Sequence, residues 1–377
     1  MRRAFLVSVF GAACLTASCA STDLGQRSVD HTVTDKSSAE AGFEFQSEKF
    51  EEDIQNSGKL IRDPELNEYL VALTDDIIGD YAGQLRVYPY EGPVFNAGIL
   101  PNGAMVVYSG LMLRAENEAQ LALVLGHEFG HYYERHSLER RAAMENAVWG
   151  SLFVGGLLAT ALYLDFSQDN ELEADQIGLE RIVEKGYDAE NAIGLWGNLA
   201  DEMANSSNKK VRKRANKSAA IFATHPTTKE RLAELESRVA NMESGERLEQ
   251  ERYRAIIRPY LQGWLEAELT RRDYGSLLHL IDRLSGLGED QGVLEYMRGQ
   301  TYATRNEDGD IDKAMEAYQN STTFADAPPV VYKVMGDAYN DMGETDKAKV
   351  AFETYLAKAP MAEDRELIMF MIKSLGN

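Results

Sequence analysis

His127-Glu128-Phe129-Gly130-His131 is an HExxH motif that continues an apolar, helix-forming run over residues 119–126. Residues four apart lie on one face of a helix, so the imidazoles of His127 and His131 can share one tetrahedral zinc ion. Glu128 lies beside them and is placed to take a proton from a water molecule at the metal. The motif therefore predicts a zinc site on a helix, with a neighbouring carboxylate as general base.

The residues before the motif favour a strong, buried helix. Asn117 is a suitable N-cap, and Gln120 three residues later can complete a capping box. Leu121, Val124 and Leu125 form an apolar face. A chance motif, or a polar helix face with two capped histidines, is the alternative in a chain with six histidines in 377 residues. The helical context favours zinc over both alternatives.

A third ligand is available in the sequence Glu-Leu-Glu-Ala-Asp at residues 171–175. Glu171 can supply a carboxylate oxygen, which is needed because a catalytic zinc usually has three protein ligands. Asp175 lies one helical turn later and can hold a ligating imidazole by a hydrogen bond. We therefore expect one zinc per chain, bound by His127, His131 and Glu171.

Six short stretches within residues 45–239 match a known pattern: Phe95-Asn96-Ala97, Ser109-Gly110-Leu111, 125–131, Arg135-His136-Ser137, 171–178 and Thr224-His225-Pro226. Together they resemble the gluzincin metallopeptidases of the HtpX and CAAX-prenyl-protease group. The resemblance implies the same three zinc ligands, with Glu128 as general base. This group often has an arginine shortly before the ligand glutamate, where residues 167–170 here are Ser-Gln-Asp-Asn. That departure concerns local support of the site and leaves the ligands in place.

The resemblance also implies an α+β metallopeptidase domain over residues 45–245, mainly helical with a small mixed sheet. Residues 48–60 and 64–80 have helical patterns. Asp63 and Pro64 open the second of these helices as a cap followed by proline at the first helical position.

Three short strands are expected before the zinc helix, at residues 85–88, 94–100 and 104–108. The second is expected at the edge of the sheet, where it can pair with an extended substrate. The resemblance favours this pairing, with Asn96, Ala97 and Gly98 as the substrate-binding residues. An ordinary structural hairpin is the alternative.

The other histidines have different predicted roles. His225 belongs to the Thr-His-Pro stretch, and the resemblance makes it a catalytic candidate near the cleft. There it can stabilise an oxyanion or occupy the open zinc position in a resting state; packing at a helix start is the alternative. His136 is five positions after His131, about 140° around the helix, so we expect it to cap or pack. His31 and His279 have no ligand partner nearby in the sequence.

The N-terminus has the pattern of a secretory signal peptide over residues 1–18. Residues 15–19, Leu-Thr-Ala-Ser-Cys, resemble a bacterial lipoprotein processing site, with Cys19 as the lipidated first residue. Cys14 is a weaker candidate, and an ordinary cleaved signal peptide is the alternative. We expect a flexible tether over residues 19–44. The protein is then periplasmic and anchored to the outer-membrane surface of a Gram-negative bacterium.

Residues 147–164 form an uncharged, apolar segment of eighteen residues, close to the length of a membrane span. The segment lies between His131 and Glu171, which must meet at one metal. A single crossing would place these two ligands on opposite sides of the bilayer. We therefore expect either core packing or shallow membrane contact.

Charge and cysteine content narrow the function further. The formal net charge of -22 argues against nucleic acid as a partner. The only two cysteines lie in the leader, so the mature domain is expected to have no disulfide. Residues 209–217, KKVRKRANK, carry six positive charges. A solvated surface is one interpretation, and contact with lipid phosphates or acidic substrate segments is the other.

Residues 250–377 are expected to form an all-α tetratricopeptide-repeat domain. One repeat contains Tyr332, Gly336, Tyr339, Ala348, Phe352 and Pro360, and the preceding one contains Gly299, Tyr302, Ala314 and Tyr318. A degenerate earlier unit is expected over residues 253–287, and a plain helical bundle is the alternative. Stacked repeats form a concave groove, which predicts a protein partner in that groove.

A zinc peptidase joined to such repeats resembles the BepA-like periplasmic proteases. We therefore expect a zinc metalloendopeptidase of the cell envelope that acts on protein substrates, in outer-membrane or periplasmic protein quality control. The alternative is a chaperone or assembly adaptor that acts mainly through its repeats and has latent protease activity.

Overall fold

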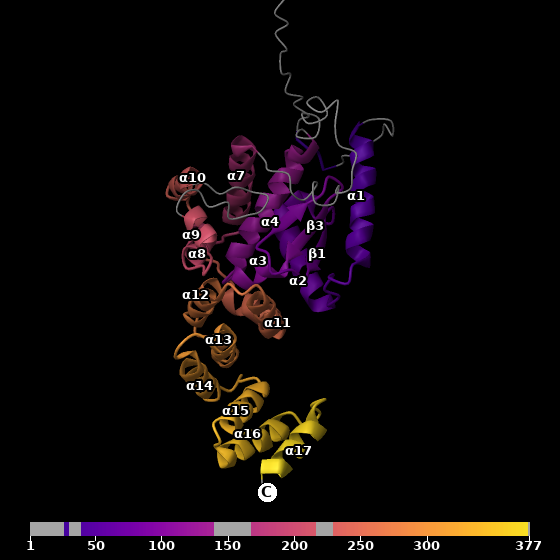
Figure 1. The fold of residues 1–377 in the computed structure, drawn as a ribbon. Helices are drawn as coiled ribbons and strands as arrows, with labels where there is room; N and C mark the ends of the chain where they lie inside the picture. Colours follow the sequence, from indigo (N-terminus) through magenta and orange to yellow (C-terminus); the bar gives the residue numbers. More distant parts are fainter. Residues whose placement is uncertain (1–25, 30–38, 139–166, 216–228, 376–377) are drawn as a thin grey trace, which may run out of the picture.

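The computed structural model describes residues 26–29, 39–138, 167–215 and 229–375, and this part of the chain is mostly helical with one small mixed sheet. In Figure 1 the sheet and its helices form one body, from which the later helices continue as an elongated arm. The described helices of the body are α1 (Ala39–Asn56), α2 (Pro64–Ile78), α3 (Ser109–Arg114), α4 (Glu118–Tyr133), α7 (Gln168–Glu184), α8 (Ala189–Ala204), α9 (Lys209–Ala215) and α10 (Lys229–Val239).

The sheet contains β1 (Arg86–Tyr90), β2 (Ala97–Ile99) and β3 (Ala104–Tyr108), in the order β1-β3-β2. β1 pairs in parallel with β3, and β2 pairs with β3 in antiparallel orientation, so β2 lies at one edge. Each strand overlaps its predicted range. The expected mainly helical domain with a small mixed sheet is therefore confirmed.

Both predicted helix starts are confirmed. The side chain of Asp63 caps α2, and Pro64 is its first residue. The side chain of Asn117 accepts a hydrogen bond from the main-chain N–H of Gln120 at 3.1 Å and so caps α4. Every residue from Glu118 to Tyr132 is buried, so α4 is a central helix that packs on all sides.

Glu118 anchors the first turn of this central helix. Its carboxylate is fully buried and accepts hydrogen bonds from the hydroxyls of Tyr69 and Tyr187, at 3.0 and 2.6 Å. Arg247 adds an ion pair at 3.1 Å. A carboxylate is also favourable at a helix N-terminus, because it faces the positive end of the helix dipole. The start of α4 is thus fixed to α2 and to the segments that follow α7 and α10.

Two described stretches within the expected tether, residues 19–44, have defined structure. The guanidinium of Arg27 donates to the carbonyl of Pro101 at 3.1 Å, lies 4.3 Å from the centre of the Tyr132 ring, and is only 4% exposed. α1 already begins at Ala39. The tether was predicted from polarity alone, which does not reveal that Arg27 contacts Pro101 and Tyr132 of the folded body.

Several predicted features lie outside the described residues. They are the signal peptide and Cys19, His31, the apolar segment 147–164, and His225. Within the described part of the chain, no helix is long and apolar enough to cross a membrane.

Beyond residue 249 the described chain is helical apart from short connections. Its helices are α11 (Gln250–Thr270), α12 (Tyr274–Ser285), α13 (Gln291–Arg305), α14 (Asp310–Ser321), α15 (Val330–Asp341), α16 (Thr345–Lys358) and α17 (Arg365–Leu375). α13 packs against α14, and α15 packs against α16. Figure 1 shows these helices stacked one after another away from the sheet, with α17 at the far end.

Candidate metal centre

Small residues bring α4 and α7 into backbone contact. An ideal Cβ added to Gly130 would lie 2.8 Å from the Cα of Ala174, and one added to Gly178 would lie 2.9 Å from the main-chain nitrogen of His127. Larger residues at either position would force the helices apart. The close packing places the HExxH motif directly against residues 171–175.

Three side chains converge where these helices meet. The Nε2 atoms of His127 and His131 are 3.1 Å apart. The carboxylate of Glu171 lies 3.7 Å from the first of these atoms and 3.5 Å from the second. All three residues are 1% exposed. The structure thus brings together the three residues that the sequence predicts as ligands.

The three donor groups fit a tetrahedral ion. Two ligand atoms that each lie about 2.1 Å from zinc are about 3.4 Å apart at a tetrahedral angle. The two imidazole nitrogens, 3.1 Å apart, are close to this value. His127 lies 3.7 Å from Oε2 of Glu171 and His131 lies 3.5 Å from Oε1, so each imidazole faces a different oxygen of the carboxylate. Two imidazole nitrogens and one carboxylate oxygen are also a common donor set at catalytic zinc. These residues could hold a metal ion with little rearrangement.

Asp175 fixes the orientation of one imidazole. Its Oδ1 atom lies 2.9 Å from Nδ1 of His127. Burial raises the pKa of Asp175, but the charge and hydrogen bonds of Arg231, with a further hydrogen bond from His127, outweigh burial and lower the pKa to about 2. An ionised carboxylate only accepts hydrogen bonds, so Nδ1 of His127 carries the proton. The lone pair on Nε2 then points toward Glu171 and His131, as metal binding requires.

Arg231 is a member of this cluster that the sequence analysis missed. It lies on α10, is 5% exposed, and donates hydrogen bonds to the carboxylates of both Asp175 and Glu171. Burial alone would lower its pKa, but Asp175, Glu171 and Glu128 together raise it. Arg231 therefore stays charged. Glu128, itself 1% exposed, is close enough to contribute to this effect.

His136 packs against the centre, in line with the packing role expected for it, but it does so through a turn of the chain. Its Nδ1 atom lies 2.9 Å from Nδ1 of His131, and its Nε2 atom lies 3.2 Å from Glu173. α4 ends at Tyr133, and Arg135 has a φ of 60°. The left-handed residue turns the chain, so an angle measured around a continuing helix does not apply. Burial lowers the pKa of His136, which favours a neutral ring.

The predicted substrate strand is well packed. Asn96, Ala97 and Gly98 are all buried, and β2 belongs to the sheet edge. The main-chain N–H of Tyr108 donates to the carbonyl of Asn96 at 3.1 Å. His279 lies in α12, far from α4 in the sequence, and is half-buried.

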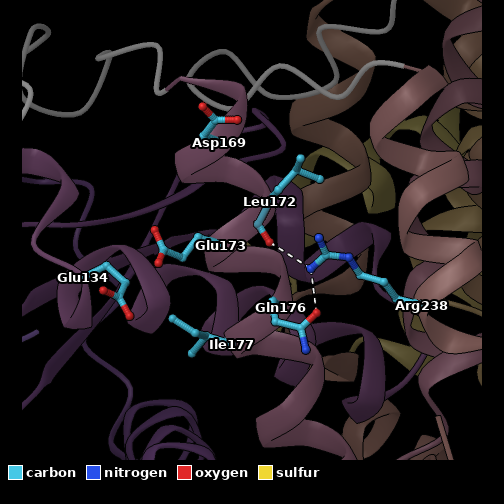
Figure 2. Close-up of a pocket in the computed structure, with 7 residues that line it drawn as sticks. All are labelled: Glu134, Asp169, Leu172, Glu173, Gln176, Ile177 and Arg238. Atoms are coloured by element: carbon cyan, nitrogen blue, oxygen red, sulfur yellow. Dashed lines mark hydrogen bonds between the residues drawn. The ribbon is translucent and has the colours of Figure 1, made fainter. Parts of the chain in front are cut away.

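A shallow pocket of about 430 Å³ opens along α7 (Figure 2). Figure 2 shows that Arg238 of α10 reaches α7 there, donating to the carbonyl of Leu172 and to the side chain of Gln176. None of the three donor residues lines the pocket, which is formed by Glu134, Asp169, Leu172, Glu173, Gln176, Ile177 and Arg238. The pocket is therefore separate from the centre.

The geometry agrees with a comparison against known families, in which residues 86–239 match the model for peptidase family M48. This part of the chain is similar to that family. The matched residues include β1, α4 and α7, and end at the last residue of α10. The M48 match confirms the metallopeptidase resemblance seen in the sequence.

Three curated relatives are also similar to this chain. The chain is 26% identical over 214 residues to the beta-barrel assembly-enhancing protease of Escherichia coli (strain K12), covering 50% of this chain and 42% of that protein. It is 33% identical over 162 residues to the mitochondrial metalloendopeptidase OMA1 of Schizosaccharomyces pombe, covering 40% and 45%. It is 28% identical over 161 residues to the metalloprotease YcaL of Escherichia coli (strain K12), covering 39% and 59%.

The chain thus spans about two fifths of the length of the beta-barrel assembly-enhancing protease that it matches. This partial coverage leaves the activity, substrates and partners of the whole protein to be proposed.

Proposed function

We propose that this protein is a zinc-dependent endopeptidase. His127, His131 and Glu171 hold one zinc ion, and Glu128 is the general base. The observation that carries the proposal is the convergence of three buried donor groups, with the two imidazole nitrogens 3.1 Å apart and each within 3.7 Å of the Glu171 carboxylate. Glu128 is next in sequence to the first ligand and equally buried.

Glu128 and Asp175 are proposed to have different roles in peptide hydrolysis. A bound zinc ion supplies Lewis acidity, which makes water nucleophilic near neutral pH. Glu128 accepts the proton from the attacking water and passes it to the leaving amine. Asp175 keeps the proton of His127 on Nδ1 and so keeps Nε2 available. Burial of the centre excludes bulk water, which strengthens each of these interactions.

We place the substrate along β2, with Asn96, Ala97 and Gly98 forming the strand that an extended peptide pairs with. The edge position of β2 supports this, since strand addition needs an edge. His225 is proposed to act at the same cleft, either on the oxyanion or at the open metal position. It precedes Arg231 by six residues, so the connecting chain spans at most about 21 Å.

The arm is proposed to consist of tetratricopeptide repeats over residues 250–377, following a peptidase domain over residues 45–245. Equivalent helix pairs support this: an ideal Cβ on Gly299 of α13 would lie 2.3 Å from the Tyr318 ring of α14, and one on Gly336 of α15 would lie 2.6 Å from the Phe352 ring of α16. The same small-to-aromatic contact thus recurs in consecutive pairs. We propose that the arm binds a protein partner.

We further propose that the protein works in the bacterial envelope, in outer-membrane protein assembly or quality control. The support comes from relatives named as beta-barrel assembly-enhancing proteases. A signal peptide over residues 1–18 and lipidation of Cys19 would place the enzyme in the periplasm at the outer membrane. Lipid labelling that persists in Cys19→Ala would contradict the anchor.

The test of the catalytic proposal is a Glu128→Gln variant assayed for zinc content and for cleavage of casein. Wild type should bind one zinc and cleave, and the variant should bind one zinc without cleaving. Glu180→Gln on α7 is the matched control, because Glu180 is exposed and bonds only to Gln176 among its described contacts. It should behave as wild type. A wild-type protein without zinc, or a Glu128→Gln variant that cleaves at the wild-type rate, overturns the proposal.

The same variant separates the enzyme from the adaptor alternative. In cells, loss of outer-membrane assembly in Glu128→Gln indicates that proteolysis is needed. Full retention of outer-membrane assembly by the variant indicates that the protein acts mainly as an adaptor, through the arm.

A further inference from the structure

Arg231 is a buried cation in the centre of a carboxylate cluster. It comes from α10 and is 5% exposed, and its partners lie on α7, 56 and 60 positions earlier in the chain. Its guanidinium is 5.9 Å from the centre of the Trp196 ring of α8. Three helices of the body thus meet at this one side chain.

The guanidinium holds both α7 carboxylates at once. Its Nε and Nη2 atoms form a two-pronged contact with the two oxygens of Asp175, each bond being 2.6 Å long. Its third nitrogen, Nη1, donates to Oε2 of Glu171. The planar guanidinium has donors in a fixed fork that matches a carboxylate, and a lysine ammonium has no such fork. Arginine is therefore suited to fix two carboxylates in one arrangement.

Each of these carboxylates governs part of the candidate metal centre. Glu171 is a donor group itself. Asp175 fixes the tautomer and direction of His127. Arg231 contacts both carboxylates, so it fixes the position of Glu171 directly and that of His127 through Asp175. It thus orients two of the three donor groups without being a donor itself.

We propose that Arg231 is the positioning residue of the zinc centre, holding Glu171 and Asp175 where zinc needs them. This inference rests on the proposed zinc function. It means that α10 contributes to the metal centre by orienting two carboxylates, in addition to the ligands that α4 and α7 supply.

Charge and geometry predict opposite effects of Arg231 on metal affinity. A positive charge beside the site repels Zn²⁺, so if charge dominated, removing it would tighten binding. If positioning dominates, removing it weakens binding, because the carboxylates lose their fixed arrangement. The three short bonds to groups that are 1–2% exposed favour positioning.

The test compares zinc affinity in Arg231→Lys, Arg231→Gln and two matched controls, measured by competition with a chromophoric chelator on the full chain. Arg238→Lys and Arg238→Gln are the controls. Arg238 lies two turns further along α10 and also bonds to α7, through Leu172 and Gln176, but touches no donor group. Replacing zinc by Co²⁺ adds an absorption spectrum that reports the ligand geometry.

Positioning predicts a ten- to hundredfold loss of zinc affinity in Arg231→Gln, a smaller loss in Arg231→Lys and an altered cobalt spectrum in both. The Arg238 variants should stay within twofold of wild type. If Arg231→Gln does not fold, Arg231→Lys decides, because it retains the buried positive charge. Wild-type affinity and spectrum in Arg231→Lys overturn the inference, as does tighter binding in Arg231→Gln. A wild type that binds neither metal would instead overturn the proposed function.

Discussion

Gly130→Ala tests whether the contact between α4 and α7 controls metal binding. The new Cβ would lie 2.8 Å from the Cα of Ala174 and 3.0 Å from its carbonyl oxygen. Both are backbone atoms, which cannot rotate away. Ordinary contact begins at 3.4 Å, so the helices must separate by about 0.6 Å, the difference between these distances.

The separation is too large for a metal centre that spans both helices. Metal–ligand distances tolerate deviations of about 0.2 Å, so the zinc-bound form must keep the helices together and retain the overpacking strain of about 1–3 kcal/mol. The zinc-free form relieves that strain by letting the helices separate. Since 1.4 kcal/mol is a factor of ten, zinc affinity should fall by about 5- to 150-fold. The free energy of unfolding of the zinc-free protein should therefore change little. Any strain left after the helices separate is largely offset by the higher helix propensity of alanine, about 1 kcal/mol.

Chelator competition measures the zinc affinity, and urea unfolding of the zinc-free protein measures the stability. Gly194→Ala in α8 is the control, because no atom lies within 4 Å of its added Cβ. It should gain up to about 1 kcal/mol of stability and keep the wild-type zinc affinity. A Gly130→Ala variant with zinc affinity within twofold of wild type would refute the reasoning.

Three further predictions follow from named contacts. Glu171→Ala should lower zinc content sharply, as measured by atomic absorption, because three protein ligands are usual at catalytic zinc; full occupancy would exclude Glu171 as a ligand. Arg114→Met should lower the free energy of unfolding by about 3–5 kcal/mol in urea titrations, because it removes the buried cation between Glu202 and Glu268 and leaves Glu268 with Arg271. Gly336→Ala should cost about 1–3 kcal/mol in the same assay, since its methyl would overlap a buried aromatic ring; an unchanged midpoint would contradict that packing.

The cluster of candidate metal ligands was predictable because its signals are local. His127, His131 and Glu171 each belong to a short helical pattern, and only the meeting of the two helices depends on the fold. Asn117 was predictable for the same reason, since a helix cap needs only its own first turn.

Arg231 and His136 were not predictable by the same reasoning. Arg231 stands in KERLAELESRV, an amphipathic run in which an arginine looks like a surface residue. Its partners on α7 are at least 56 positions away. His136 required knowledge that α4 ends at Tyr133 and that Arg135 turns the chain. Arg231 reaches the centre through long-range packing, and His136 reaches it through a backbone turn. Neither feature leaves a recognisable pattern in the neighbouring sequence.

The arm is joined to the peptidase body at elements that flank the candidate site. Arg114 ends α3, the short helix between β3 and the motif helix α4, and its buried guanidinium pairs with Glu202 of α8 at 2.7 Å and Glu268 of α11 at 2.6 Å. Burial would lower the pKa of Arg114, but these two carboxylates raise it, so Arg114 stays charged.

α11 also touches the segment that leads into the proposed substrate strand. Arg271 donates to the carbonyl of Pro93 at 2.8 Å, and the indole of Trp264 donates to Glu91 at 3.4 Å. The first helix of the arm thus contacts both the loop before β2 and the helix before the metal ligands. A buried ion pair is lost at high cost when one partner leaves, so these contacts hold the arm in one orientation on the body. If the arm binds a protein and β2 binds the substrate, as proposed, that protein approaches β2 from a fixed direction.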